Sequence, residues 1–117
     1  MKDFRTLKVW EKSHKIVIKL YGLTEKFPKT EMFGLVSQIR RASASIPTNI
    51  SEGCGRGSDL DFARFLQISM GSASELEYLI LLSVDLKFIS KEDESLLIIE
   101  IQEIKKMLTA LINKIKQ

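Results

Sequence analysis

The chain has few of the residues on which disulfides, histidine metal sites and membrane spans depend. Its 117 residues include one cysteine, Cys54, so no internal disulfide can form, and one histidine, His14. No window offers the roughly 18 uncharged apolar residues that a membrane-spanning helix needs, and the N-terminal residues lack the apolar core of a signal peptide. We therefore expect a cytoplasmic protein without a membrane segment, in which Cys54 is an inert free thiol.

The scarcity of histidine also limits catalysis and metal binding. Glu11 and His14 have the Glu-x-x-His spacing of di-iron helical bundles, but that site needs a second such motif and two further glutamates. Glu52 and Glu75 could face each other as an acid/base pair, yet nothing in the sequence fixes a substrate pocket beside them. The sequence therefore predicts no enzyme, no metal site and no cofactor. His14 is expected to be a core histidine hydrogen-bonded to a neighbour.

What is present is typical of one soluble globular domain, expected to span residues 1–117. Apolar residues make up 44% of the chain and charged residues 28%, with a net charge of +3. Residues 1–29 hold eight Lys or Arg against three acids, net +5, and residues 67–104 hold eight acids against two lysines, net −6. The basic part could attract phosphate, or it could pair with the acidic part within one subunit or across two.

Hydrophobic periodicity predicts four amphipathic helices and no strand. The first helix ends before Pro28, because the residue before a proline disfavours helix. Thr30, Ser58 and Ser90 are predicted to cap the other three. Short links place sequence neighbours antiparallel, so we expect an all-α, up-down-up-down four-helix bundle. The predicted helices cover about 7–26, 31–53, 58–88 and 90–115.

The second helix contains two residues that a helix core rarely accepts. Pro47 removes one backbone donor and crowds the carbonyl of Ser43, so the helix is predicted to kink, at a cost of about 3 kcal/mol or more unless neighbours compensate. Asn49 falls at core spacing, and the carbonyl freed by Pro47 is the expected partner of its amide. Gly53 is expected to end the helix.

The third helix is apolar almost all round its axis from residue 78 to residue 89. Such a helix needs a second buried face, supplied either by its neighbours within the monomer or by another subunit. Gly71 belongs to a patch of small residues where another helix could come close, opposite residues 42–44. The residues predicted to lie in a subunit interface are Tyr78, Leu81, Leu82 and Phe88.

Basic residues form the candidate nucleic-acid site. Lys8, Lys12, Lys15 and Lys19 share one face of the first helix and could bind RNA or DNA phosphates without sequence preference, or they could simply form a solvated outer face. Four arginines, two adjacent in the second helix and two near the glycine turn, are also candidates. They could bind phosphates or a partner's carboxylates, or they could pair with acids of a packed helix such as Glu75 or Glu77. These arginines are Arg40, Arg41, Arg56 and Arg64.

The stretch QIRRASASIPTNISEG, residues 38–53, resembles the pattern QIRRA..SIP.NI.EG.GR of the 23S rRNA-intervening sequence protein family. The likeness extends over nearly the whole chain, through Trp10, His14, YGLTEKFP at 21–28, Gly34-Leu35, Gly55-Arg56, FARFL at 62–66 and the residues Gly71 to Ala73 with Glu75. These proteins are small four-helix bundles encoded within insertions in bacterial ribosomal RNA genes. We expect structural roles for the motif residues Pro47, Asn49, Glu52, Gly53, Gly71 and Glu75.

The resemblance implies a ring-shaped homo-oligomer, for which five subunits is the suggested number. Similar rings are formed by the accessory proteins of diversity-generating retroelements, which engage a reverse transcriptase and its RNA. We therefore expect a non-catalytic, homo-oligomeric binding module that contacts RNA or another nucleic acid through its basic surface. The alternative is a scaffold that binds protein partners and no nucleic acid.

Overall fold

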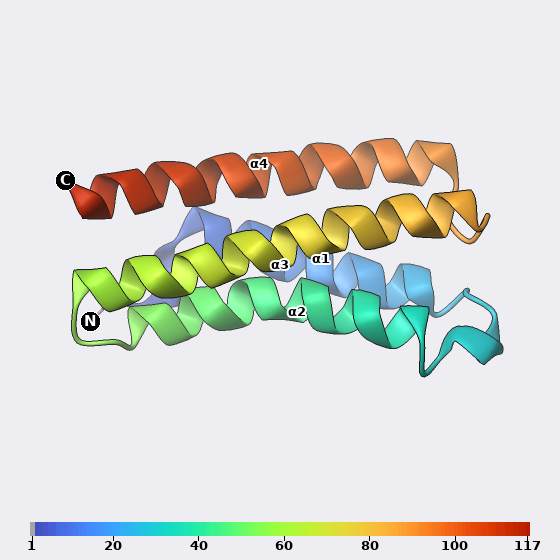
Figure 1. The fold of residues 1–117 in the computed structure, drawn as a ribbon, viewed down its shortest axis with the longest axis horizontal. Helices are drawn as coiled ribbons and strands as arrows, with labels where there is room; N and C mark the ends of the chain where they lie inside the picture. Colours follow the sequence, from blue (N-terminus) through green and yellow to red (C-terminus); the bar gives the residue numbers. More distant parts are fainter. Residues whose placement is uncertain (1) are drawn as a thin grey trace.

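The computed structural model describes residues 2–117, and every regular element in that part of the chain is helical. The long helices run alternately in opposite directions, and the chain begins and ends at the same end of the bundle (Figure 1). The all-α, four-helix prediction is confirmed. The helices are α1 (Lys8–Thr24), α2 (Leu35–Cys54), α3 (Asp59–Asp85) and α4 (Lys91–Lys116), with short 3-10 turns at Phe4–Thr6 and Lys29–Glu31.

The two predicted serine caps are confirmed. The Ser58 hydroxyl accepts a hydrogen bond from the backbone N–H of Asp61 at 3.1 Å, and the Ser90 hydroxyl accepts one from Asp93 at 3.1 Å. Each bond satisfies a donor that the first helical turn leaves without a partner, which stabilises a helix by about 1 kcal/mol. The starts of α3 and α4 are therefore set by local chemistry.

The other helix ends differ from the prediction. Thr30 caps no helix: it lies in the 3-10 turn, in which the Pro28 carbonyl accepts the N–H of Glu31 at 2.9 Å, and α2 begins only at Leu35. At the far end, α3 stops at Asp85 rather than Phe88. Lys87 takes a positive φ of 68°, and the N–H of Phe88 returns to the Ser83 carbonyl at 2.8 Å. This left-handed residue with its returning bond is a Schellman motif, which ends a helix.

Within α2, the helix is continuous through the buried Pro47. The predicted partner of Asn49 is wrong. Its amide Nδ2 donates to the Ser45 carbonyl at 2.8 Å and to the Ser45 hydroxyl at 2.9 Å, because the side chain reaches back one turn along its own helix. The carbonyl of Ser43 is not its acceptor. Asn49 is half-buried, so its amide bonds locally to Ser45 and the rest of the side chain remains partly exposed to solvent.

Gly53 does not end α2, which continues to Cys54. A Cβ at Gly53 would lie 2.9 Å from the Cβ of Phe65 and 3.0 Å from Cδ1 of Phe62. The absence of a side chain therefore allows α2 to pass directly over the first turns of α3. Gly53 is a residue of close helix contact and not a helix terminator.

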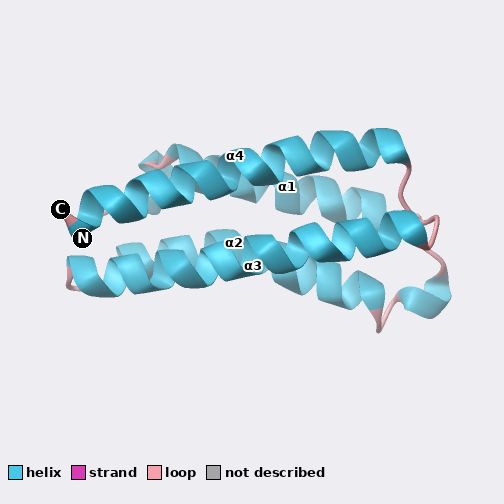
Figure 2. Cartoon of the chain, turned by 45° about the horizontal axis from the view of Figure 1, so that its top comes forward, coloured by secondary structure: helices cyan, strands magenta, loops and turns pink. Residues whose placement is uncertain are grey.

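One hydrophobic core runs through the bundle, and all four helices contribute to it. Figure 2 shows α1 and α4 on one side of the bundle and α2 and α3 on the other. No helix among residues 2–117 is both long and apolar enough to cross a lipid bilayer. The largest fully buried side chains are Ile16, Leu20, Ile39, Ile46, Ile50, Leu66, Leu76, Ile80, Leu97, Ile101, Ile104 and Leu108.

Candidate interaction surfaces

A large apolar groove lies between α3 and α4, with a volume of about 760 Å³. Tyr78 and Leu81 of α3 are 58% and 49% exposed there, and Ile99 of α4 is 57% exposed. A surface of this kind on a soluble helix is typical of a site that another protein covers. We call it the α3–α4 groove, and it is lined by Ser74, Glu77, Tyr78, Leu81, Glu94, Ser95, Ile98, Ile99 and Lys105.

Polar side chains close one part of this groove. Lys105 Nζ donates to Glu77 Oε1 at 2.7 Å, and Gln102 Nε2 donates to Glu77 Oε2 at 2.9 Å, so one α3 carboxylate is held by two α4 side chains. The Lys105 and Glu77 side chains are only 23% and 32% exposed, which makes this pair stronger than a fully solvated one. The groove wall is thereby fixed, and Glu77 is not available to an arginine.

The structure separates the four residues predicted for a subunit interface. Tyr78 and Leu81 are exposed in the α3–α4 groove, whereas Leu82 and Phe88 are half-buried and pack against the core of their own chain. Phe88 contacts Phe27, with 5.4 Å between the ring centroids. The monomer therefore covers part of the apolar circumference of α3 and leaves the part that faces the groove open.

The lysines of α1 share one side of the helix, but acids neutralise three of them. Lys12 lies 3.0 Å from Glu103 and Lys19 lies 2.9 Å from Glu100, so both pair with α4. Lys15 pairs along its own helix with Glu11 at 3.6 Å. The basic and acidic parts of the sequence thus pair within one subunit. Within residues 2–117, the structure shows no ion pair for Lys8, the remaining member of the predicted set.

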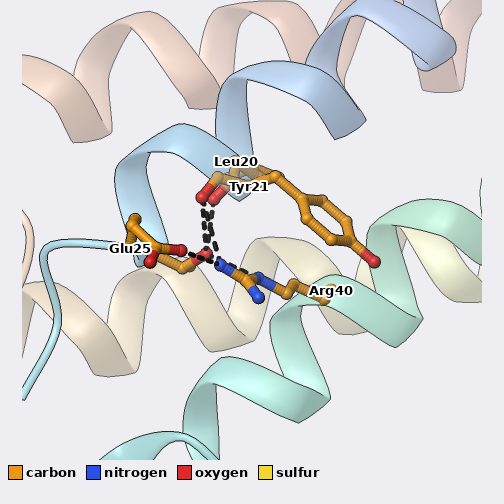
Figure 3. Close-up of polar contacts among 5 residues, drawn as sticks. Leu20, Tyr21, Glu25 and Arg40 are labelled. Atoms are coloured by element: carbon orange, nitrogen blue, oxygen red, sulfur yellow. Dashed lines mark hydrogen bonds and ion pairs between the residues drawn. The ribbon is translucent and has the colours of Figure 1, made fainter. Parts of the chain in front are cut away.

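Arg40 secures the C-terminal end of α1 (Figure 3). Its Nε donates to the Thr24 hydroxyl at 3.0 Å, while its Nη2 donates to the Tyr21 carbonyl at 3.2 Å and to Glu25 Oε2 at 3.1 Å. The guanidinium also lies over the Tyr21 ring, 4.5 Å from its centroid. Its side chain is only 20% exposed. Arg40 therefore joins α2 to three groups at the end of α1, one of which, the Tyr21 carbonyl, also accepts the N–H of Glu25 at 3.2 Å; this role suits the planar, multiply donating guanidinium.

Arg41 points to solvent beside a second groove, of about 450 Å³, between α2 and α3. Glu75 lines the same groove from the opposite helix, but no ion pair joins the two residues. The prediction that Arg40 or Arg41 pairs with Glu75 or Glu77 is therefore wrong: Arg40 pairs with Glu25, and Glu77 with Lys105.

Small residues bring α2 and α3 together beneath this second groove. The hydroxyls of Ser45 and Ser72 are 2.8 Å apart, and the buried Ser69 hydroxyl donates to the Ile46 carbonyl at 2.8 Å. The two helices therefore approach each other closely, but the contacts that show it are at residues 45 and 46 rather than at the predicted residues 42–44. Gly71 does not make it, because a Cβ there would meet nothing within 4 Å.

Arg56 and Arg64 lie on either side of the α2–α3 turn and cover one aromatic ring. Their guanidinium carbons are 4.7 Å and 5.0 Å from the ring centroid of Phe65, which is itself 6% exposed. Arg56 also pairs with Glu52 at 3.1 Å, and Arg64 with Asp61 at 3.5 Å. Glu52 thus has a structural role at this turn, and both guanidiniums remain partly open to solvent.

His14 is not a core residue. It is exposed and stacks on Trp10, with 4.9 Å between ring centroids and 9° between the planes, because Ser13 takes the neighbouring buried position. Among residues 2–117 there is no group of three or more His, Cys, Asp or Glu side chains that could hold a metal ion. Cys54 is buried, and burial raises the pKa of its thiol, which disfavours the reactive thiolate.

Three exposed apolar side chains lie at positions that the sequence does not single out. Phe33, in the connection before α2, is 97% exposed, and Leu60 at the start of α3 is 79% exposed. Leu96 on α4 is 54% exposed. Phe33 could have been noticed in the sequence as a large apolar residue that directly precedes a glycine and is not on the apolar seam of the second helix.

A model of the 23S rRNA-intervening sequence protein family matches residues 5–110. The chain belongs to this family. The crystal structure of a protein of unknown function from the S23 ribosomal protein family of Bacteroides thetaiotaomicron VPI-5482 is similar, with a TM-score of 0.83 and 28% identity over 90% of this chain and 95% of that chain. No curated protein is significantly similar. Neither the family description nor that of the crystal structure names a catalytic activity.

Proposed function

We propose that this 23S rRNA-intervening sequence protein is a non-catalytic helical module that assembles with copies of itself through the α3–α4 groove. The observation that carries the proposal is the exposed apolar face formed by Tyr78, Leu81 and Ile99 on two adjacent helices. Covering that face in a second copy removes apolar surface from water, which is the main driving force of subunit association. The family resemblance implies that this assembly is a ring, with five subunits as the suggested number.

The energetic requirement is moderate. Complete burial of one large apolar side chain contributes about 1.5–3 kcal/mol, so several such residues together can offset the cost of bringing two chains together. The fixed Lys105–Glu77 pair at the groove adds to this, because a rigid surface loses little side-chain freedom when a partner binds. The groove therefore has both the apolar surface and the rigidity that a subunit contact needs.

Light scattering on the purified protein tests self-assembly. We expect the wild type to have a mass that is a multiple of the 13.4 kDa chain, and Leu81→Glu to fall to a single chain while keeping its helical circular dichroism. Ile68→Glu is the matched control, since Ile68 is a similarly exposed α3 residue, at 43%, outside the groove. A wild type that stays at 13.4 kDa at micromolar concentration contradicts the proposal.

Nucleic-acid binding is a second candidate, supported by the charge at one end of the bundle. The helix ends that meet beside the chain termini, residues 2–12, 50–66 and 105–117, hold ten Lys or Arg against five acids, whereas the rest holds eight against ten. Excess positive charge in one region attracts the phosphate backbone without reading its sequence. Lys8, Arg56 and Arg64 of the predicted set lie in this end, and Lys12 there is paired with Glu103.

Filter binding of structured RNA at rising salt tests the second candidate. Retention at low salt that falls steeply with salt supports phosphate contact. Lys114→Glu with Lys116→Glu, at the basic end, is expected to reduce retention. Charge reversal of Lys12, Lys15 and Lys19 is the comparison, and it is expected to have the smaller effect because all three already pair with acids. No retention at low salt removes this function.

A further inference from the structure

Phe33 is a large apolar side chain held in the open by a fixed turn. It is 97% exposed, more than any other large apolar residue of the described chain. The backbone on both sides is hydrogen-bonded: the N–H of Met32 donates to the Lys29 carbonyl at 3.1 Å, and the N–H of Gly34 donates to the Glu31 carbonyl at 3.1 Å. The phenyl ring is therefore exposed on a turn that backbone hydrogen bonds hold in place.

The chain's own α3–α4 groove is out of reach of this ring. Phe33 directly precedes α2, whose neighbours in the bundle are α1 and α3, whereas the groove lies on the far side of α3, against α4. Figures 1 and 2 both show the connection between α1 and α2 at the edge of the bundle remote from α4. Contact between Phe33 and such a groove therefore requires two copies of the chain.

Phe33 and the groove nevertheless lie at the same height along the bundle. The 2.8 Å contact between Ser45 and Ser72 sets the register of the antiparallel helices α2 and α3. Leu35, ten residues before Ser45, is then level with Leu82, ten residues after Ser72. Leu81 lines the groove at that level. Two copies placed side by side with their axes in the same direction therefore bring the Phe33 turn of one to the groove of the next.

We propose that Phe33 of one copy inserts into the α3–α4 groove of the next copy. This inference rests on the proposed self-assembly and names the surface that fills the groove. The ring would pack among Tyr78, Leu81, Ile98 and Ile99, in a groove of about 760 Å³. One charge pair supports the contact, because Lys29 in the Phe33 turn is opposite in sign to Glu94 on the groove wall; Glu31 in the same turn has the same sign as Glu94.

A contact between two different surfaces has a defined consequence for assembly. Each copy offers one Phe33 turn and one groove, so the contact is head-to-tail and can repeat from copy to copy, giving a ring if the rotation closes and an open filament if it does not. An isologous dimer, in which the same patch meets itself, would leave Phe33 uncovered. The two arrangements can therefore be separated by mixing variants that each lack one surface.

Sedimentation of Phe33→Glu and Leu81→Glu, alone and mixed, provides this test. We expect each variant alone to sediment as a 13.4 kDa chain, and the mixture to give a one-to-one dimer, since one variant keeps an intact Phe33 and the other an intact groove. Leu60→Glu is the control: Leu60 is 79% exposed but lies at the opposite end of the bundle, so this variant should assemble like the wild type.

Disulfide trapping gives a second measurement that leaves Phe33 in place. Met32→Cys combined with Ser95→Cys puts one thiol beside Phe33 and one on the groove wall. Oxidation of the assembled protein should give a covalent ladder longer than a dimer, and each single variant should give none. The native Cys54 does not interfere, because it is buried.

These measurements distinguish the failure of Phe33 insertion from the failure of self-assembly through the α3–α4 groove. If Leu81→Glu dissociates while Phe33→Glu remains assembled, or if the trapped oligomer gives no ladder, the groove is a subunit contact but Phe33 does not fill it. If the wild type is itself a single chain, self-assembly fails, and Phe33 insertion fails with it.

Discussion

The side chain of Arg40 on α2 donates through Nε to the hydroxyl of Thr24, the last residue of α1, at 3.0 Å. Thr24 is itself buried and donates to the Leu20 carbonyl at 2.6 Å. The end of the first helix is thus joined to the N-terminal part of the second by a chain of bonds that begins at a guanidinium. A basic residue that the sequence suggests for phosphate binding instead fixes the position of one helix against another.

Replacing Arg40 by alanine should therefore destabilise the protein. The variant loses bonds from the guanidinium to the Thr24 hydroxyl, the Tyr21 carbonyl and Glu25, and a hydrogen bond to a charged group is worth on the order of 1.5–3 kcal/mol. Because two of these bonds are solvent-exposed, we expect a net loss of about 2–3 kcal/mol in urea unfolding. Arg41→Ala, at the exposed neighbouring position, should change stability by less than about 0.5 kcal/mol. Equal losses in the two variants would contradict the assigned role.

Gly53 and Gly71 should respond in opposite ways to the same substitution. Gly53→Ala places a Cβ 2.9 Å from the Cβ of Phe65, so α2 and α3 must separate, at an expected cost of about 1–3 kcal/mol. Gly71→Ala meets nothing within 4 Å and lies inside a helix, so it should stabilise the protein by up to about 1 kcal/mol. Thermal or urea unfolding of the two variants measures both signs. A stabilised Gly53→Ala would show that the helices can separate without loss.

Features governed by neighbouring residues were predictable from the sequence. The helix number and the starts at Ser58 and Ser90 follow from periodicity and from a hydroxyl three residues before a backbone donor. The α2 start was not predictable from Thr30, because Pro28 sets up a 3-10 turn that uses Thr30 before the helix begins. The end of α3 depends on the left-handed conformation of Lys87. A lysine in the sequence does not predict that conformation, because positive φ is uncommon for residues other than glycine.

The candidate site was harder to predict, since it depends on which helices are neighbours. The lysine face of α1 is correctly placed by its spacing, but its neutralisation by Glu100 and Glu103 depends on α4 returning beside α1. The sequence shows that α3 has more apolar surface than one core contact can cover. Which part of that surface stays exposed depends on packing within the chain, such as the contact of Phe88 with Phe27. Phe33 is not on the apolar seam of any predicted helix, so hydrophobic periodicity does not identify it as an exposed contact residue.

The α1–α4 ion pairs should contribute little to stability. Lys19 and Glu100 are 2.9 Å apart, but their side chains remain 46% and 30% exposed. A double-mutant cycle with Lys19→Ala and Glu100→Ala should give a coupling of roughly 0.2–1 kcal/mol that decreases as salt is added. A coupling well above that range, or one insensitive to salt, would mean that this pair fixes the position of α4.

Cys54 should make the folded protein lose stability at alkaline pH. Burial raises the pKa of its thiol above the ordinary value of 9.0, with smaller opposing effects from nearby charges such as Lys2. A raised pKa means that the folded state holds the proton more tightly than the unfolded state. Its contribution to stability is therefore fully present below the unfolded pKa and is lost as the pH rises through the folded pKa.

The Cys54→Ala variant isolates this effect from the titration of lysines and tyrosines, which both proteins share. Between pH 8 and about pH 11, the unfolding free energy of the wild type should fall relative to that of the variant. In the same range, the folded wild type should react more slowly with a thiol reagent than the urea-unfolded chain does, because folding both covers the sulfur and keeps it protonated. Parallel stability curves together with a freely reactive thiol would show that Cys54 is accessible in the native bundle.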